Sequence, residues 1–97
     1  MTNRYEWDPA KDSVNQRKHG IGLAEATAIF DGPVFTRIDD REDYGETREV
    51  SIGLLGGAVV LTVAHTERSG RCRLISARRA TPSERRIFYA YLEATLG

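Results

Sequence analysis

The chain contains one cysteine, Cys72, and two histidines, His19 and His65, in 97 residues. A single cysteine cannot form an intramolecular disulfide, which is typical of a protein in a reducing compartment. Two distant histidines and one cysteine do not provide the ligand spacing of a metal site. No apolar run approaches the ~20 residues that span a bilayer, and the first residues lack the apolar stretch of a signal peptide. We therefore expect a cytoplasmic protein that uses no metal or other cofactor.

Net charge is also absent, because 14 basic residues balance 14 acidic ones. The two signs are nevertheless separated along the chain. Seven arginines and two carboxylates lie between His65 and Arg86, whereas six carboxylates and two arginines lie in residues 31–46. Arginine side chains bind phosphate oxygens two at a time, so the first segment indicates an anionic partner. We expect a dipolar molecule with one basic and one acidic region.

The length and the apolar share of 40% predict one domain over residues 1–97. Asp8-Pro9 and Gly20 are the expected start and end of a surface helix over residues 9–19. The remaining expected elements are a short helix over 23–30, strands over 34–38, 47–55, 58–66 and 71–78, and a C-terminal helix that begins with the capping box Thr81-Pro82-Ser83-Glu84. The predicted fold is α+β, with two N-terminal helices, an antiparallel sheet of three to four strands and a C-terminal helix.

Gly56-Gly57 predicts a two-residue hairpin turn, because both glycines tolerate positive φ. Leu55 would then pair with Ala58, and counting along the strands places Arg48 opposite His65. The same register forms the apolar pairs Val50–Val63, Ile52–Leu61 and Leu54–Val59. The following strand has two alternatives: a three-residue loop puts Arg73 beside His65, and a two-residue loop puts Leu74 there.

Motifs along nearly the whole chain resemble the BrnT family of small toxins. The matching residues are 5–9, Asn15, 18–21, Ala26 with Phe30-Asp31, 45–48, Ile52-Gly53, 66–68, 73–81 and Glu84-Arg85. The resemblance implies a RelE-like fold and an RNA-cleaving toxin of a bacterial type II toxin–antitoxin system that blocks translation. It also implies a BrnA-like antitoxin with a ribbon-helix-helix domain, through which alone the complex reaches operator DNA and represses its own operon. A toxin–antitoxin heterotetramer is the expected assembly.

RNA cleavage without a metal needs a base for the ribose 2′-hydroxyl, cations for the phosphate and an acid for the leaving oxygen. Histidine titrates near neutral pH, so His65 or His19 is a candidate base or acid. Glu67, which we expect on the opposite face of the strand from His65, is a second candidate base. The predicted catalytic residues are Arg48, His65, Glu67, Arg78 and Arg79. The predicted RNA-binding residues are Lys18, His19, Arg68, Arg71 and Arg73.

Structural interpretations remain open for several of these residues. His65 is also a candidate hydrogen-bonded strand residue, His19 a cation at a helix C-terminus, and Arg48 an ion-pair partner of Glu46 or Glu67. An alternative function is a catalytically weak binding module that acts with its partner in transcriptional autoregulation. An independent DNA-binding repressor is disfavoured, because no predicted helix combines basic residues with a helix-turn-helix pattern.

Overall fold

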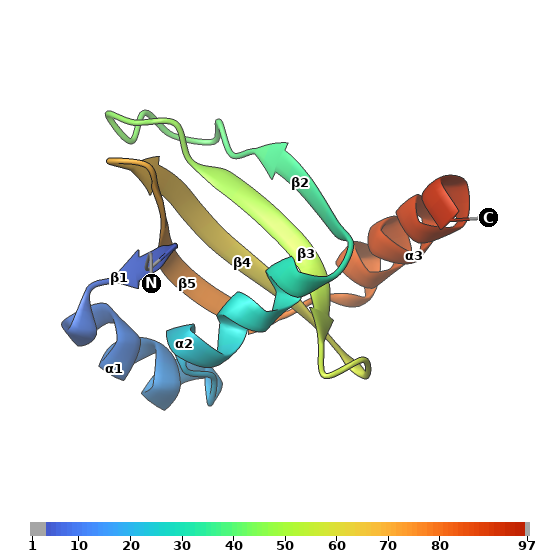
Figure 1. The fold of residues 1–97 in the computed structure, drawn as a ribbon, viewed down its shortest axis with the longest axis horizontal. Coiled ribbons are helices and arrows are strands. Elements are labelled where there is room, and N and C mark those ends of the chain that lie inside the picture. The colour runs from blue at the N-terminus through green and yellow to red at the C-terminus, as the bar shows by residue number, and fades with distance from the viewer. Residues whose placement is uncertain (1–3, 97) are drawn as a thin grey trace.

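The computed structural model describes residues 4–96, which form three helices, a 3₁₀ turn and one five-stranded sheet (Figure 1). The elements in chain order are β1 (Tyr5–Trp7), α1 (Pro9–His19), α2 (Leu23–Ala26), η1 (Thr27–Asp31), β2 (Val34–Ile38), β3 (Glu49–Leu55), β4 (Val59–Arg68), β5 (Arg71–Arg79) and α3 (Pro82–Leu96). The strand order is β1-β5-β4-β3-β2, with β1 parallel to β5 and all other neighbours antiparallel. The α+β class is confirmed, but the expected antiparallel sheet of three to four strands is wrong, because β1 makes the sheet mixed.

Strand β1 is the element that the sequence pattern missed. Tyr5 and Trp7 pack against the core on one face of the sheet. Glu6 points to the other face, where its carboxylate accepts a hydrogen bond from Arg73 at 2.6 Å. Three residues are too few to show alternation, and the partner strand begins more than 60 residues later. The stability of β1 therefore depends on long-range pairing with β5 rather than on local propensity.

Both ends of α1 form as the sequence predicts. The Asp8 carboxylate accepts a hydrogen bond from the Ala10 N–H at 2.8 Å, and Pro9 occupies the first turn. Gly20 ends the helix with φ 72°, a left-handed conformation that favours glycine. Local capping chemistry therefore decides both boundaries.

The predicted capping box of α3 is also present. The Thr81 N–H donates to the Glu84 carboxylate at 2.8 Å, and the Glu84 N–H donates to the Thr81 hydroxyl at 3.1 Å. The predicted helix over 23–30 is instead a four-residue α2 followed by η1. The Thr27 hydroxyl donates to the Ala24 carbonyl at 2.7 Å where the chain tightens into the 3₁₀ turn.

The β3–β4 turn contains three residues, Gly56, Gly57 and Ala58, and not two. Leu55 therefore pairs with Val59, and Glu49 pairs with His65. The predicted pairing of Arg48 with His65 is wrong, as are the three apolar pairs counted from it. The additional turn residue shifts the register by one position. Because side chains alternate between the faces of a sheet, residues that were expected to share a face now lie on opposite faces.

The β4–β5 turn has the two-residue form. Ser69 and Gly70 both have positive φ, 54° and 80°, and Arg68 pairs with Arg71. Leu74 therefore lies opposite His65, as the two-residue alternative predicted. A β-bulge then leaves Ile75 without a partner on β4, and this bulge changes the register of the rest of β5.

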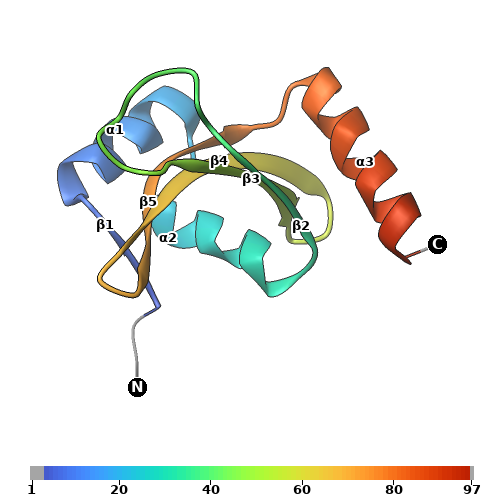
Figure 2. The ribbon, with the colours of Figure 1, turned by 90° about the horizontal axis from the view of Figure 1, so that it is seen from above.

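The two faces of the sheet are covered to different extents. Buried residues of α2 and η1, including Leu23 and Ile29, pack against Leu61 on one face. On the other face, Phe88 of α3 packs against Ile52, and α3 then extends away from the sheet (Figures 1 and 2). Within residues 4–96, no helix has the length and apolar character needed to cross a membrane.

Candidate functional site

Strand alternation gathers arginines from distant parts of the chain on the sheet face that α3 partly covers. The cross-strand pairs on this face include Arg37–Val50, Arg78–Thr62 and Arg73–Thr66. Arg48, directly before β3, follows the same alternation as Val50. We call this surface, defined by Arg37, Arg48, Arg73 and Arg78, the arginine face.

One row of side chains crosses four strands of the arginine face. Extended by one position beyond its last pair, the β3–β4 register places Arg48 beside Thr66; Thr66 lies opposite Arg73, and Arg73 lies opposite Glu6. The Thr66 hydroxyl donates to the Thr47 carbonyl, so it is held in place. Adjacent strands lie ~4.8 Å apart, so these side chains share one patch of surface. The row combines two cations, a hydroxyl and a carboxylate.

Arg48 is held by stacking. Its guanidinium carbon lies 3.7 Å from the centre of the Tyr44 ring, and its buried Nε has no hydrogen-bond partner within residues 4–96. The Tyr44 hydroxyl donates to Asp39 at 3.2 Å, and Arg41 donates to the same carboxylate at 2.8 and 2.9 Å. The Arg41 hydrogen bonds hold the pKa of Asp39 well below its usual range. No ion pair neutralises Arg48 in the described part of the chain, so its charge is available to an anion.

A groove of about 330 Å³ lies beside this row, between the β2–β3 loop and the start of α3. Val50, Thr62, Ala64 and Ser76 form its floor. Its walls carry Arg37, Asp39, Asp40, Arg41, Arg78 and Glu84. The volume falls at the lower end of the range typical of small-ligand clefts. Three arginines and three carboxylates therefore line the groove, and two of the arginines, Arg41 and Arg78, pair with carboxylates of the lining, Asp39 and Glu84.

Arg78 is fixed by Glu84 at the base of α3. The guanidinium donates two hydrogen bonds to that carboxylate, at 2.7 and 2.9 Å. Thr62 also donates to Glu84, at 3.1 Å. The hydrogen bond from Arg78 lowers the pKa of Glu84 to about 2, although burial opposes the shift. Glu84 therefore stays ionised at neutral pH and orients Arg78 along the groove.

The opposite face contains a separate cavity of about 470 Å³, which we call the His65 pocket. It is lined by Arg4, Tyr5, Phe30, Glu49, His65, Thr66, Glu67, Gly70, Arg71 and Cys72. His65 is only 7% exposed, and its Nε2 is 2.7 Å from the Ser51 hydroxyl, which in turn is 2.7 Å from the Thr36 hydroxyl. The Phe30 ring packs nearly perpendicular to the imidazole, with 5.3 Å between the ring centres. Burial lowers the pKa of His65, while Glu49 acts in the opposite direction, so the ring is neutral at pH 7.

The other groups of the His65 pocket include two carboxylates and a thiol. Glu67 lines this pocket together with His65. The expectation that Glu67 lies on the opposite face is wrong, since residues two apart on a strand share a face. Burial raises the pKa of the Cys72 thiol to about 11, which keeps it protonated. No cluster of three metal-ligating side chains occurs in residues 4–96.

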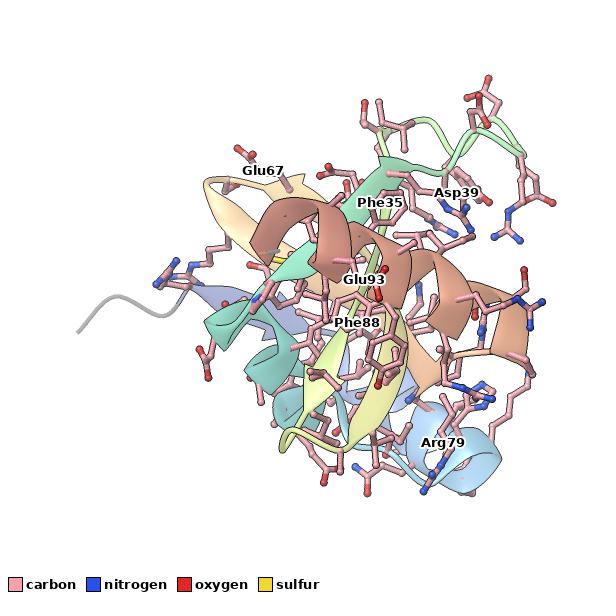
Figure 3. The ribbon with its side chains drawn as sticks, turned by 90° about the vertical axis from the view of Figure 1, so that its right-hand side faces the viewer. Phe35, Asp39, Glu67, Arg79, Phe88 and Glu93 are labelled. Atoms are coloured by element: carbon pink, nitrogen blue, oxygen red, sulfur yellow. The ribbon has the colours of Figure 1, made fainter. Side chains whose placement is uncertain are left out.

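The structure does not bring the five predicted catalytic residues together. Arg48 and Arg78 lie on the arginine face, and His65 and Glu67 lie on the opposite one. Arg79, the last residue of β5, is exposed, and Figure 3 places it far from Glu67. In the sheet, Arg79 pairs with Leu61 and Glu67 with Cys72, a separation of about 20 Å along the strands.

The predicted RNA-binding residues occupy three different places. Arg71 and Arg73 contact Glu6 at 3.9 and 2.6 Å, and Arg68 contacts Glu46 at 3.4 Å. Lys18 and His19 lie elsewhere, in a groove between α1 and β5. The separate basic and acidic regions expected from the sequence are therefore wrong, because carboxylates interleave with the arginines in space.

Three residues on or beside the arginine face are not among the site residues predicted from the sequence. Arg37 lies in the expected strand over 34–38, and Arg41 lies in the acidic stretch 39–46, for which the sequence predicts a solvated loop. Glu6 was missed because its position depends on the parallel pairing of β1 with β5. The position of Arg37 within the predicted strand over 34–38 is the one local signal for the face on which its side chain lies.

Comparisons with known proteins agree with this fold. A family model described as "Ribonuclease toxin, BrnT, of type II toxin-antitoxin system" matches residues 7–84. The crystal structure of the Brucella abortus ribonuclease toxin BrnT superposes with a TM-score of 0.64 and 23% identity, covering 82% of this chain and 99% of that one. No curated protein sequence matches the chain. At this identity the structural match shows a shared fold.

Proposed function

This chain belongs to the BrnT family of ribonuclease toxins of type II toxin–antitoxin systems, and we propose that it cleaves RNA on the arginine face. The proposal rests on one observation. Arg48, Thr66, Arg73 and Glu6 form a single row on an accessible sheet face, and Arg78 lies farther along the same face. Phosphate-binding cations and a carboxylate are therefore within reach of one strand of RNA.

In this mechanism, Arg48 and Arg73 bind the scissile phosphate. The Glu6 carboxylate accepts the proton of the attacking 2′-hydroxyl, because only one of its oxygens is held at short distance by Arg73. The arginines stabilise the charge that develops on the five-coordinate phosphate, and no metal is used. Arg78 binds a neighbouring phosphate in the groove. In this internal transfer the O2′–P bond forms and the P–O5′ bond breaks, the leaving O5′ takes a proton from solvent water, and Glu6 returns its proton to solvent.

His65 and Glu67 are the alternative acid–base pair. Both line the His65 pocket, but the thickness of the sheet separates them from Arg48 and Arg78. His65 is also nearly buried, and its Nε2 is hydrogen-bonded to the Ser51 hydroxyl. We therefore assign His65 a structural role and place the reaction on the arginine face.

The biological consequence that we propose is arrest of translation through RNA cleavage in the cytoplasm. Membership of a type II toxin–antitoxin family implies an antitoxin partner. We propose that this partner is a BrnA-like ribbon-helix-helix protein that neutralises the toxin, forms a heterotetramer with it and carries the complex to operator DNA.

Induction of the chain in a bacterium that lacks the system tests the function. Wild type and the control Arg86→Ala, a change on the exposed side of α3, are expected to arrest growth and fragment cellular RNA within minutes. Arg48→Ala and Glu6→Gln are expected to be folded and non-toxic. With purified proteins, loss of one such phosphate contact slows cleavage by about 10²–10³-fold.

Two outcomes contradict the proposal in different ways. Full toxicity of Arg48→Ala would exclude the arginine face as the cleavage site. Absence of RNA cleavage by folded wild-type protein would favour the alternative function, a binding module that acts with its partner in autoregulation.

A further inference from the structure

A second groove, of about 300 Å³, is lined by residues of α1 and β5. Figure 1 shows α1 beside this end of the sheet. Its lining includes Val14 and Ile75, with Lys11, Lys18 and His19 around them. We call it the α1 groove. It lies outside the arginine face and outside the His65 pocket.

The backbone explains why apolar side chains are accessible there. β1 pairs with β5 only at Cys72 to Leu74, so the rest of this edge of β5 has no neighbouring strand. The Asn15 amide donates to the Ala77 carbonyl at 2.8 Å and accepts from the Ala77 N–H at 3.1 Å. Both backbone polar groups of Ala77 at this open strand edge therefore have hydrogen-bond partners. The bulge residue Ile75 then lines the groove, and Val14 is 49% exposed above it.

Two lysines, Lys11 and Lys18, give the rim of the α1 groove positive charge. No ion pair within residues 4–96 engages Lys11, Lys18 or His19. The carboxylates of Asp8 and Asp12 on the same part of the chain lie outside the lining of the groove, and each accepts a backbone hydrogen bond at 2.8 Å, from Ala10 and Leu23 respectively. Arg79 lies on the α1 side of the molecule in Figure 3 and adds to the positive field.

We infer that the α1 groove binds an acidic, amphipathic segment of the antitoxin, an inference that rests on the toxin–antitoxin pairing proposed above. One apolar side chain of that segment packs between Val14 and Ile75, and carboxylates on either side meet Lys11 and Lys18. A protein fits this surface better than RNA. The lining has no Phe, Tyr or Trp side chain on which a base would stack; its one ring is the imidazole of His19, and its floor is aliphatic.

The test compares two variants of the full chain with a matched control, using the purified cognate antitoxin as the probe. Lys11→Glu combined with Lys18→Glu is expected to weaken antitoxin binding at least about tenfold, mainly through slower association, and Val14→Gln several-fold through faster dissociation. Arg17→Glu reverses one charge on the same helix outside the groove, half of the charge change in the double variant, and is expected to bind within about twofold of wild type. Unfolding temperatures measured in parallel check that each protein is folded.

Each alternative outcome overturns the inference in a distinct way. Equal antitoxin binding by Lys11→Glu/Lys18→Glu and Arg17→Glu would place the antitoxin on another surface. Loss of RNA binding with antitoxin binding unchanged would assign the α1 groove to RNA. Conversion of a wild-type dimer to a monomer in light scattering, with antitoxin binding unchanged, would assign it to a second copy of the chain. If wild type itself does not bind the antitoxin, this result contradicts the proposed toxin–antitoxin pairing, on which the inference about the groove depends.

Discussion

The arginine face and the His65 pocket lie on opposite sides of the same sheet, and they hold their polar groups in different ways. On the arginine face, Arg78 pairs with Glu84 and lines the groove, and Arg48 stacks on Tyr44 beside the groove. In the His65 pocket, the imidazole is nearly buried and bound to a chain of two hydroxyls. An open face with oriented cations can receive a polyanion, whereas a buried neutral imidazole mainly supports the fold. Residue type alone favours His65 as the catalyst, and its surroundings favour the arginines.

The largest expected effect separates the two regions by activity. Arg73→Ala should slow cleavage of a purified RNA by about 10²–10³-fold, because it removes a phosphate contact and a partner of Glu6. His65→Gln keeps a hydrogen-bonding group beside Ser51 and should leave the cleavage rate within about threefold, since no transition-state contact is lost. Single-turnover kinetics on folded variants measures both. The reverse ranking would move the active centre to the His65 pocket.

The second prediction concerns packing on the sheet face that α2 and η1 cover. A Cβ at Gly53 would lie 2.9 Å from Val34 Cγ1 and 3.0 Å from Ile29 Cβ. Gly53→Ala should therefore destabilise the protein by about 1–3 kcal/mol through overpacking. Ala64→Val enlarges a side chain on the floor of the open groove instead and should change the free energy of unfolding by less than about 0.5 kcal/mol. Denaturant unfolding of both variants tests whether the two faces differ in this way.

The third prediction uses acid to probe the arginine face. The folded-state pKa of Glu84 is lowered to about 2 from an ordinary value of 4.5. Its ionisation therefore stabilises the fold fully above pH 4.5, and this contribution is lost as the pH falls from 4.5 toward 2. Glu84→Gln should lower stability at pH 7 by about 1–2 kcal/mol, limited by the partial exposure of Arg78. Thermal unfolding from pH 6 to pH 2.5 should fall less steeply for the variant, and parallel curves would contradict the assignment.

The smallest expected effect uses milder acid to probe the His65 pocket. The folded-state pKa of His65 lies below its ordinary value of 6.5, because the buried imidazole resists protonation. Its neutral form therefore contributes stability above pH 6.5 that is lost as the pH falls below 6.5, before Glu84 titrates. His65→Gln should remove this part of the pH dependence, a change of less than about 1 kcal/mol between pH 7 and 5.5. If the variant keeps the wild-type slope, another group is responsible.

The prediction of the fold from sequence succeeded where one short segment carries the decisive chemistry. The start and end of α1, the strand at Val34–Ile38 and the capping box of α3 all depend on residues within a few positions of one another. It failed at β1 and at the β3–β4 register. The first depends on a pairing across most of the chain, and the second on whether Ala58 belongs to the turn or to the strand.

The prediction of the site failed for the same physical reason. Arg48 and His65 are correctly placed near the open end of one hairpin, yet a shift of one residue puts them on opposite faces. The clustering of arginines in the sequence likewise did not predict their surroundings, since Arg73 and Arg78 acquire different carboxylate partners, Glu6 and Glu84, from opposite ends of the chain.

By itself, the sequence determined both ends of α1, the start of α3, the approximate positions of β2 to β5 and the motifs of the BrnT family, because helix caps and strand alternation are local. Only the tertiary structure decided which side chains share a surface. That outcome depends on strand register and on which distant segment supplies each edge. It brings Glu6, Arg48 and Arg73 into one row, encloses His65 on the other side and exposes the apolar floor of the α1 groove.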